Sequence, residues 1–300
     1  MTGESQSDVA EIAILPTTSL RAAMSAIASA LRAAGIDNAE KDARYLVQGI
    51  LGLDATALVR DPDLPVGDFA AILEAAARRR IAHEPVSRIL GSREFYGRLF
   101  KVTPDVLDPR ADTEALVELV LDIVRGDQAL QGEITIADIG VGSGAILVTL
   151  LAELPKARGI AIDVSEAALV VAADNALTHG VADRMTTVAT RGLQGITQPL
   201  DIIVSNPPYI VSSDIAGLDA SVRQFDPHLA LDGGPDGLQI YREIASDIRL
   251  LSQNCWVALE FGSGQLLDVQ GIFSALNVRN TLTRADLGGH IRVVALEIHR

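Results

Sequence analysis

The chain has 300 residues, 48% hydrophobic and 21% charged, and its 25 basic and 39 acidic side chains give a net charge of −14 at pH 7. This composition is typical of a folded globular protein and excludes a disordered one, and the length favours about two domains. The single cysteine, Cys255, excludes internal disulfide bonds and a cysteine-based metal site.

Charge and hydropathy also limit location and partners. The first basic residue is Arg21, with no apolar run of a secretory signal after it, and no stretch approaches the ~18 apolar residues of a membrane helix. We therefore expect a cytoplasmic monomer without a membrane partner. The acidic balance makes a nucleic-acid partner unfavourable, since binding a phosphate backbone requires basic charge. No lysine follows a glycine, which excludes a P-loop.

Residues 1–90 are predicted to form a helical domain, of which the first 16 residues are a loose tail. Apolar residues recur every three or four positions from Leu20 and stop at Gly35, as in an amphipathic helix. The expected helices cover 17–34, 39–51 and 67–82. A small bundle of this kind offers a rigid surface, and we expect residues 1–90 to recognise the substrate.

A short linker is predicted over residues 91–111. The segment from Glu94 to Val102 alternates around Gly97, which indicates a β-hairpin within 92–104. A second domain is expected over 112–300.

Strands and helices alternate in this second domain. The strands are expected over 134–139, 159–163, 185–189, 200–205, 255–261, 278–284 and 291–298, and the helices over 112–125, 145–153, 165–178, 236–252 and 264–275. Such alternation predicts an α/β fold with a mainly parallel sheet covered by helices on both faces.

A glycine-rich turn joins the first of these strands to its helix. Its glycines at 140, 142 and 144 permit positive φ and close approach to a ligand, but their spacing differs from the G-x-G-x-x-G of dinucleotide folds. Asp163 ends the next strand, where a carboxylate can accept from both ribose hydroxyls. Together they indicate a nucleoside without a diphosphate, such as S-adenosylmethionine, with Asp138 near its amino-acid end. The alternatives are that the glycines only permit a tight connection between strand and helix, and that Asp163 is only an acidic residue at the start of the next helix.

The segment Asn206-Pro-Pro-Tyr209 follows the apolar strand that ends at Ser205. Two prolines fix the backbone and remove amide donors, so the nearby carbonyls can act as acceptors. The Asn206 side-chain oxygen and the Pro207 carbonyl can each accept a hydrogen from a planar –NH2 group, with Tyr209 against its π-face. This arrangement suits methyl transfer to an amide or exocyclic amine. A merely rigid turn is the alternative.

With these motifs, the sequence resembles the HemK/PrmC family of peptide chain release factor glutamine-N5 methyltransferases over nearly its whole length. The segments that carry the resemblance are Glu84-Pro85, Gly91-Ser-Arg-Glu-Phe-Tyr-Gly97, Val106-Leu-Asp-Pro-Arg-Ala-Asp-Thr-Glu114, Asn206–Tyr209 and Asp226-Pro-His-Leu-Ala-Leu-Asp-Gly-Gly-Pro-Asp-Gly-Leu238. The resemblance implies a Rossmann-like seven-stranded sheet of S-adenosylmethionine-dependent methyltransferases, with an N-terminal helical bundle and a β-hairpin linker. It also implies methylation of the glutamine in the Gly-Gly-Gln loop of release factors.

The resemblance carries over residue by residue to the expected site. The implied cofactor contacts are Asp138, Ile139, Gly140, Val141, Gly142, Asp163 and Asn206. The implied substrate contacts are Asn206, Pro207, Pro208 and Tyr209, of which Asn206, Pro207 and Tyr209 are the expected catalytic residues. Asp108 and Ala111 depart from the family pattern in the linker. At Thr190-Arg-Gly-Leu193 the family's acidic and aromatic pair is missing, so no adenine contact is carried over there.

Other functions remain open from the sequence alone. A ribosomal protein is an alternative glutamine substrate, an adenine-N6 DNA methyltransferase would share Asn206–Tyr209, and a non-catalytic binding module would keep the fold. The five histidines are scattered without ligand spacing, and we expect no metal. Arg110 and Glu114 are spaced to pair across one helical turn, in a structural role.

Overall fold

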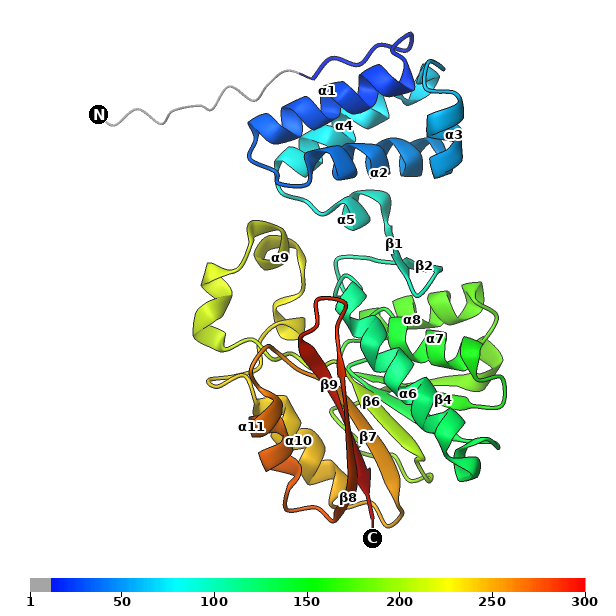
Figure 1. The fold of residues 1–300 in the computed structure, drawn as a ribbon, viewed down its shortest axis with the longest axis vertical. Helices are drawn as coiled ribbons and strands as arrows, with labels where there is room; N and C mark the ends of the chain where they lie inside the picture. The colour runs from blue at the N-terminus through cyan, green and yellow to red at the C-terminus, as the bar shows by residue number, and fades with distance from the viewer. Residues whose placement is uncertain (1–11, 300) are drawn as a thin grey trace, which may run out of the picture. The chain divides into compact units, whose positions relative to one another are not determined.

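The computed structural model describes residues 12–299, and the chain divides between Gly91 and Ser92 into two units. The first unit is helical, and the second contains the large sheet (Figure 1). Each unit has a hydrophobic core of its own.

Helices of the first unit pack as a bundle, as predicted. They are α1 (Leu20–Ala33), α2 (Ala39–Leu51), α3 (Ala55–Arg60), α4 (Ala70–Ile81) and α5 (Val86–Leu90), with a 3-10 turn at Gly67–Phe69. The Ser19 hydroxyl caps α1 by accepting from the Ala22 amide, and Gly52 ends α2 at φ 66°, which favours glycine. The apolar faces of α1, α2 and α4 form the core.

Two details of this unit were predicted wrongly. Residues 12–16 are not a loose tail, because Ile12 and Ile14 are buried in the bundle core and the Ile14 amide donates to Glu74 Oε1 at 2.7 Å. Residues 1–11 of the predicted tail lie outside the described residues. The sequence pattern also misses α3 and α5, since helices of six and five residues are too short to show a repeating apolar stripe.

The predicted β-hairpin is present at the start of the second unit. Strands β1 (Ser92–Phe95) and β2 (Arg98–Lys101) pair antiparallel with Phe95 opposite Arg98. The two turn residues, Tyr96 and Gly97, both have positive φ, as a two-residue hairpin turn requires. Phe95 and Phe100 are buried against each other and anchor the hairpin to the core beneath it.

Seven strands form the main sheet, in the order β5-β4-β3-β6-β7-β9-β8. They are β3 (Thr135–Ile139), β4 (Arg158–Asp163), β5 (Met185–Ala189), β6 (Ile202–Ser205), β7 (Cys255–Glu260), β8 (Val278–Ala285) and β9 (Ile291–Ile298). The first five in this order are parallel, and β9 runs antiparallel to both of its neighbours. This confirms the expected Rossmann-like methyltransferase sheet.

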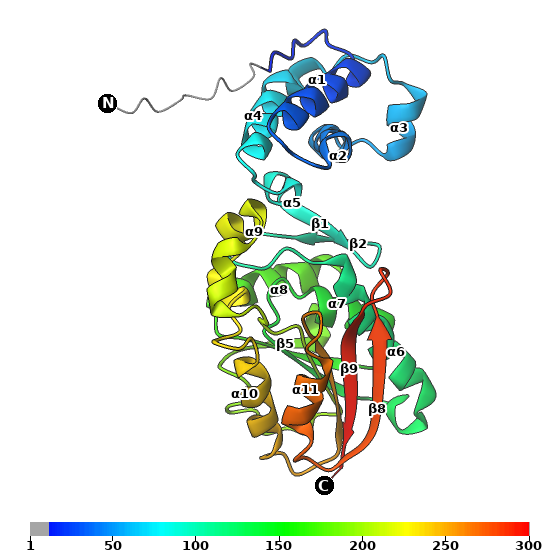
Figure 2. The same ribbon diagram turned by 60° about the vertical axis from the view of Figure 1, so that its left-hand side comes forward.

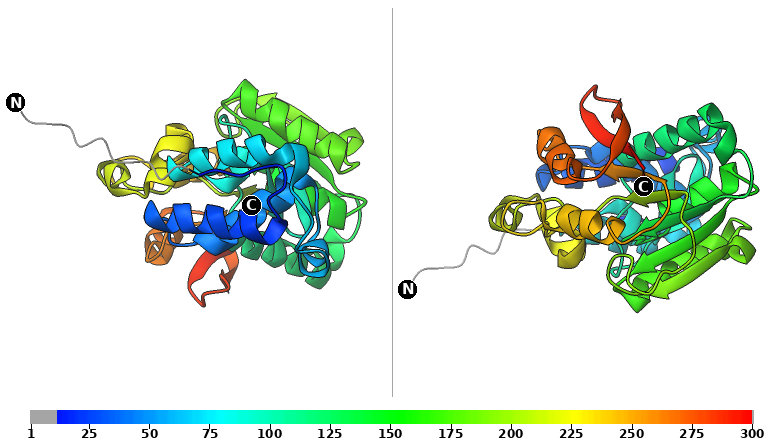
Figure 3. Two further views of the ribbon diagram at one scale, coloured as in Figure 1. Left: turned by 90° about the horizontal axis from the view of Figure 1, so that it is seen from above. Right: turned by 90° about the horizontal axis from the view of Figure 1, so that it is seen from below.

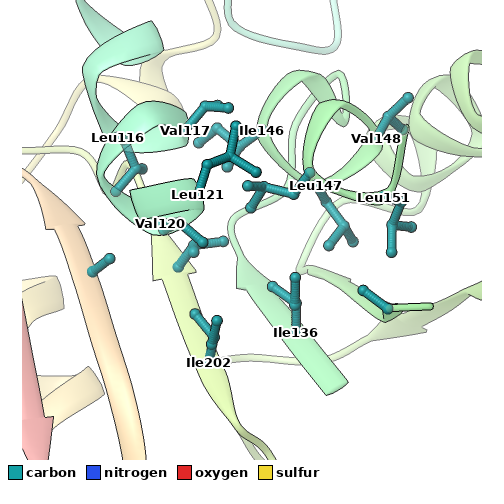
Figure 4. Packing of buried hydrophobic residues seen from close by; sticks show 14 of the residues in the cluster. Leu116, Val117, Val120, Leu121, Ile136, Ile146, Leu147, Val148, Leu151 and Ile202 are labelled. Carbon is teal, nitrogen blue, oxygen red and sulfur yellow. The ribbon is translucent and has the colours of Figure 1, made fainter. Parts of the chain in front are cut away.

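Helices cover both faces of the sheet (Figures 2 and 3). One face carries α6 (Glu114–Gly126), α7 (Ala145–Glu153) and α8 (Glu166–Thr178), and the other carries α10 (Gln239–Ile248) and α11 (Leu266–Phe273). Successive strand residues alternate between the two cores: Ile136 packs under α6 and α7, and Ala137 faces the opposite side. Figure 4 shows side chains of α6 and α7 gathered over Ile136 and Ile202.

The connection between β6 and β7 contains structure that the sequence pattern misses. It holds a 3-10 segment at Ser212–Gly217, helix α9 (Ala220–Phe225) and a 3-10 turn at His228–Ala230 before α10 begins. Further 3-10 turns lie at Ala111–Thr113, Gln128–Leu130 and Ala182–Arg184. Among residues 12–299, every helix is too short or too polar to cross a lipid bilayer.

Candidate active site

A cavity of about 600 Å³ opens at the carboxyl ends of the parallel strands. Successive connections from β3, β4, β5 and β6 contribute Gly140–Ser143, Asp163–Ser165, Thr190–Gly192 and Asn206–Pro208 to its wall. The strand order reverses between β3 and β6, and ligands of open α/β sheets bind at such a reversal. The cavity therefore combines the two motifs that the sequence singles out.

The glycine-rich turn presents bare backbone to this cavity. Gly140 and Gly142 have φ values of 75° and 53°, which side chains other than glycine rarely adopt. A Cβ on Gly140 would meet no atom within 4 Å, because that side of the turn faces open space. Gly144 differs, since a Cβ there would press on Ala172 and Val148 at 3.2 Å. The first two glycines form a cradle for a ligand, and the third permits close packing of α7 on α8.

Asp138 lies in β3, fully buried behind the turn. Neither carboxylate oxygen has a hydrogen-bond partner among the described residues. Burial first, and then the charge of Asp163, raise the pKa of Asp138 to about 8. An acid with two unsatisfied oxygens beside a glycine cradle fits a ligand that brings a cationic donor, such as the amino group of an amino acid.

Asp163 lies at the end of β4 and lines the cavity. Its two carboxylate oxygens accept from backbone amides, Oδ2 from Gly142 at 3.0 Å and Oδ1 from Ser165 at 2.9 Å. The carboxylate therefore ties the glycine-rich turn to the start of α8. Each oxygen keeps a second lone pair, so the Asp163 carboxylate can still accept a hydrogen bond from a ribose hydroxyl on the cavity side.

The loop after β6 places its asparagine and prolines at the cavity wall. The Ser205 hydroxyl donates to the Ile139 carbonyl at 2.6 Å and joins this loop to the glycine-rich turn. Asn206 Nδ2 donates to Thr113 Oγ1 at 3.1 Å, which leaves the side-chain oxygen as the free end of the amide. Asn206, Pro207 and Pro208 line the cavity, whereas Tyr209 packs against the core beside α10.

The phenol of Tyr209 stays neutral. Burial and the nearby charge of Glu260 raise the pKa of Tyr209 to about 12. The side chain is half-buried, and its backbone carbonyl accepts from Gln265 Nε2 at 3.2 Å. Tyr209 therefore contributes a neutral aromatic ring to the core next to the loop, on a backbone that Gln265 holds in place.

Glycines of the segment 226–238 pack directly against the backbone of the Asn206–Tyr209 loop. A Cβ on Gly233 would lie 2.8 Å from the Pro208 carbonyl oxygen and 2.8 Å from Tyr209 Cα, and one on Gly237 would lie 2.5 Å from the Tyr209 carbonyl oxygen. The Gly233 amide also donates to the Ile210 carbonyl at 2.8 Å. The glycines in this sequence motif are thus explained by backbone packing against the reactive loop.

Arg110 does not pair with Glu114 as expected. Its guanidinium binds Asp226 Oδ2 at 2.6 Å, and the Asp226 carboxylate is almost fully buried. Glu114 instead accepts from the Tyr96 amide at 2.8 Å. The Arg110–Asp226 pair joins the linker motif to the segment that supports the reactive loop, so two family motifs 116 residues apart form one structural unit.

Sequence reasoning misses Glu260, the last residue of β7. Its side chain is 3% exposed, and Oε2 has no hydrogen-bond partner among the described residues. Burial raises the pKa of Glu260 to about 7, although hydrogen bonds from Thr113 and Asn206 oppose the rise. The available signal was an acid that ends the apolar strand beside β6, the same position that Asp163 holds in β4.

The segment 190–193, for which no contact is carried over, forms the far end of the cavity. Thr190 and Gly192 line it together with Val164 and Ile240. Beside them, the Arg191 guanidinium binds the Glu243 carboxylate at 2.7 Å. In place of the family's acidic and aromatic pair, this end of the cavity therefore has apolar side chains, backbone and the Arg191–Glu243 ion pair.

Comparison with known proteins agrees with this arrangement. A model of the PrmC N-terminal domain matches residues 22–91, and a model of the methyltransferase small domain matches residues 118–227. The release factor glutamine methyltransferase of Bradyrhizobium diazoefficiens is 43% identical over 280 residues, which cover 92% of this chain and 94% of the relative. That of Cereibacter sphaeroides is 41% identical over 278 residues, which cover 92% and 97%.

Among solved structures, the hMettl16 catalytic domain in complex with a 3'UTR hairpin has a TM-score of 0.53. The match covers 67% of this chain and 76% of that one, at 15% identity. At this identity the likeness concerns the fold alone, and it agrees with a methyltransferase sheet.

Proposed function

The chain belongs to the release factor glutamine methyltransferase family, and we propose that it methylates the side-chain amide nitrogen of the Gly-Gly-Gln glutamine in a peptide chain release factor. The observation that carries this proposal is the shared cavity, in which Asn206 and Pro207 face the glycine-rich turn. One wall is suited to a nucleoside and the other to a planar –NH2 group. We also propose that the reaction takes place in the cytoplasm, where translation terminates.

S-adenosylmethionine supplies an electrophilic methyl group on a sulfonium sulfur. The backbone from Ile139 to Gly142 would cradle it, Asp163 would accept from its ribose hydroxyls, and the carboxylate of Asp138 would pair with the ammonium group of its amino-acid end. Val164, Thr190 and Ile240, which line the far end of the cavity, would enclose the adenine. The unsatisfied oxygens of Asp138 and the open space above Gly140 support this fit.

Asn206 and Pro207 hold the glutamine amide for attack. An amide nitrogen is a poor nucleophile because its lone pair is delocalised into the carbonyl. Acceptors on both N–H bonds stabilise the positive charge that grows on nitrogen in the transition state. The nitrogen–carbon bond forms as the carbon–sulfur bond breaks with its electron pair on sulfur, and one N–H proton passes to solvent. Pro208 fixes the loop, and the neutral ring of Tyr209 packs against the core next to it. Orientation is the main catalytic contribution.

The helical unit is proposed to recognise the protein substrate. Residues 17–90 carry no cofactor motif, and the sheet unit contains both walls of the cavity. A glutamine that enters the cavity must protrude on an exposed loop, so recognition of the folded partner requires a separate surface. A bundle with a buried core provides such a surface.

Methyl transfer from labelled S-adenosylmethionine tests this proposal. The full-length protein is incubated separately with purified release factor, total ribosomal protein and DNA. We expect label on the release factor, and none on a release factor whose Gly-Gly-Gln glutamine is changed to alanine. Label on a ribosomal protein or on DNA alone would contradict the proposed substrate.

A further inference from the structure

Asn206 has one neighbour that the proposed mechanism does not use, the buried carboxyl of Glu260. Strands β6 and β7 pair with Ser205 opposite Leu259, so Asn206 and Glu260 follow side by side at the carboxyl edge of the sheet. Thr113, immediately before α6, is hydrogen-bonded to Asn206, and both residues line the cavity. These three side chains come from separate parts of the sequence.

The contacts among these three side chains favour one orientation of the Asn206 amide. Asn206 Nδ2 donates to Thr113 Oγ1 at 3.1 Å, and both side chains lie close enough to the Glu260 carboxyl to lower its pKa. An ionised carboxylate can only accept, and an amide can only donate through its nitrogen. The Nδ2 end of the Asn206 amide therefore points into the protein, toward Thr113 and the neighbouring Glu260 carboxyl, and its oxygen is left for the cavity.

We propose that Glu260 and Thr113 are positioning residues, which hold the Asn206 amide with its oxygen toward the substrate glutamine. A flipped amide would present N–H groups to the N–H groups of the substrate and would repel them. The inference deepens the proposed function, on which it rests, and adds to it the means by which the acceptor is aimed.

The orientation depends on the charge of Glu260. Once protonated, this carboxyl can donate to the Asn206 oxygen, and the flipped amide becomes acceptable. The other groups that face Glu260 are Asp112, which raises its pKa, Arg292, which lowers it, and the neutral phenols of Tyr209 and Tyr241. Since burial raises the pKa of Glu260 to about 7, transfer should fall as pH decreases through this value.

Kinetics of two variants test the positioning role. Glu260→Gln should lower kcat by about ten- to hundredfold and flatten its pH dependence between pH 6 and 8, with cofactor affinity unchanged. Thr113→Val should lower kcat as well, and Thr113→Ser should restore it. Glu133→Gln is the matched control, because this exposed acid lies before β3 at the opposite edge of the sheet. Circular dichroism and melting temperatures check that each variant folds.

A nuclear magnetic resonance titration without substrate decides the inference directly. In protein labelled with ¹⁵N-asparagine, the Asn206 side-chain amide is assigned by its absence in Asn206→Asp. We expect its signals to titrate near pH 7 in the wild type and to stay constant in Glu260→Gln. An Asn206 amide that does not titrate, or titrates equally in both proteins, would overturn the inference. A wild type that titrates but does not label a release factor would instead contradict the proposed function.

Discussion

After β3 the chain turns through three glycines with positive φ, whereas after β6 it runs through two prolines that restrict the backbone. The first loop leaves space for the cofactor, because the backbone of Gly140 and Gly142 borders the open cavity. The second loop offers the substrate amide two hydrogen-bond acceptors on a rigid backbone, and Gly233 and Gly237 of another segment pack closely against it. Under the proposed function, cofactor affinity and catalysis depend on different loops of the cavity, so substitutions in one loop should affect one property and leave the other unchanged.

The largest expected effect is that of Asn206→Ala on catalysis. This change removes an acceptor that holds the substrate amide, and loss of such an oriented hydrogen bond typically lowers turnover by about 10²- to 10³-fold. Single-turnover rates at saturating cofactor measure it, and calorimetry should give a cofactor affinity within about tenfold of the wild type. Near-normal turnover would contradict the role of the β6 loop.

On the cofactor side, Asp163→Ala should weaken S-adenosylmethionine binding by roughly 1.5–3 kcal/mol, the contribution of hydrogen bonds to a charged group. The same carboxylate also accepts from the Gly142 and Ser165 amides, so part of the loss reflects the turn itself. Ser165→Ala, which removes only the hydroxyl that caps α8, is the matched control. Equal affinities of the two variants for S-adenosylmethionine in calorimetry would show that Asp163 has only a structural role.

Two glycine-to-alanine changes place the comparison within one experiment. Gly140→Ala forces a side chain into positive φ, at a cost of about 1–2 kcal/mol, and should weaken cofactor binding about tenfold with little change in kcat. Gly233→Ala would bring a Cβ within 2.8 Å of the reactive loop and should lower kcat about tenfold while the cofactor still binds. If both variants lose the same property, the two loops do not act separately.

A smaller effect concerns stability without cofactor. The pKa of Asp138 is raised to about 8, so between about pH 4 and 8 the folded protein holds a proton that the unfolded chain has released. Stability should therefore fall as pH rises through this window, and Glu260 acts in the same direction up to about pH 7. Asp138→Asn removes one of these groups, and its melting temperature should fall less than that of the wild type between pH 5.5 and 8.5. An identical fall in both proteins would show that Asp138 is ionised in the free enzyme.

The sequence predicts those elements whose signal is local. The helices at Ala39–Leu51 and Ala145–Glu153 and the strands at Met185–Ala189 and Ile291–Ile298 have the bounds that their apolar patterns predict. The short helices α3, α5 and α9 lack such a pattern, since fewer than two turns cannot show a period.

The site follows the same rule. Asp163 and Asn206 could be singled out because Asp163 ends one apolar strand and Asn206 directly follows another. The Arg110–Asp226 pair joins residues far apart in sequence, and the link from Glu260 to Asn206 depends on the pairing of β6 with β7. Such contacts depend on which strands are neighbours and on their register, and a single sequence does not specify either.

The most direct test of the account is to locate the methyl group on the product. The full-length protein is incubated with S-adenosylmethionine and an intact release factor, and the digested release factor is analysed by tandem mass spectrometry beside a reaction with Asn206→Ala. The account predicts one methyl group on the amide nitrogen of the Gly-Gly-Gln glutamine with the wild type and at least about a hundredfold less with the variant. A methyl group on any other residue, or equal labelling by both proteins, would contradict it.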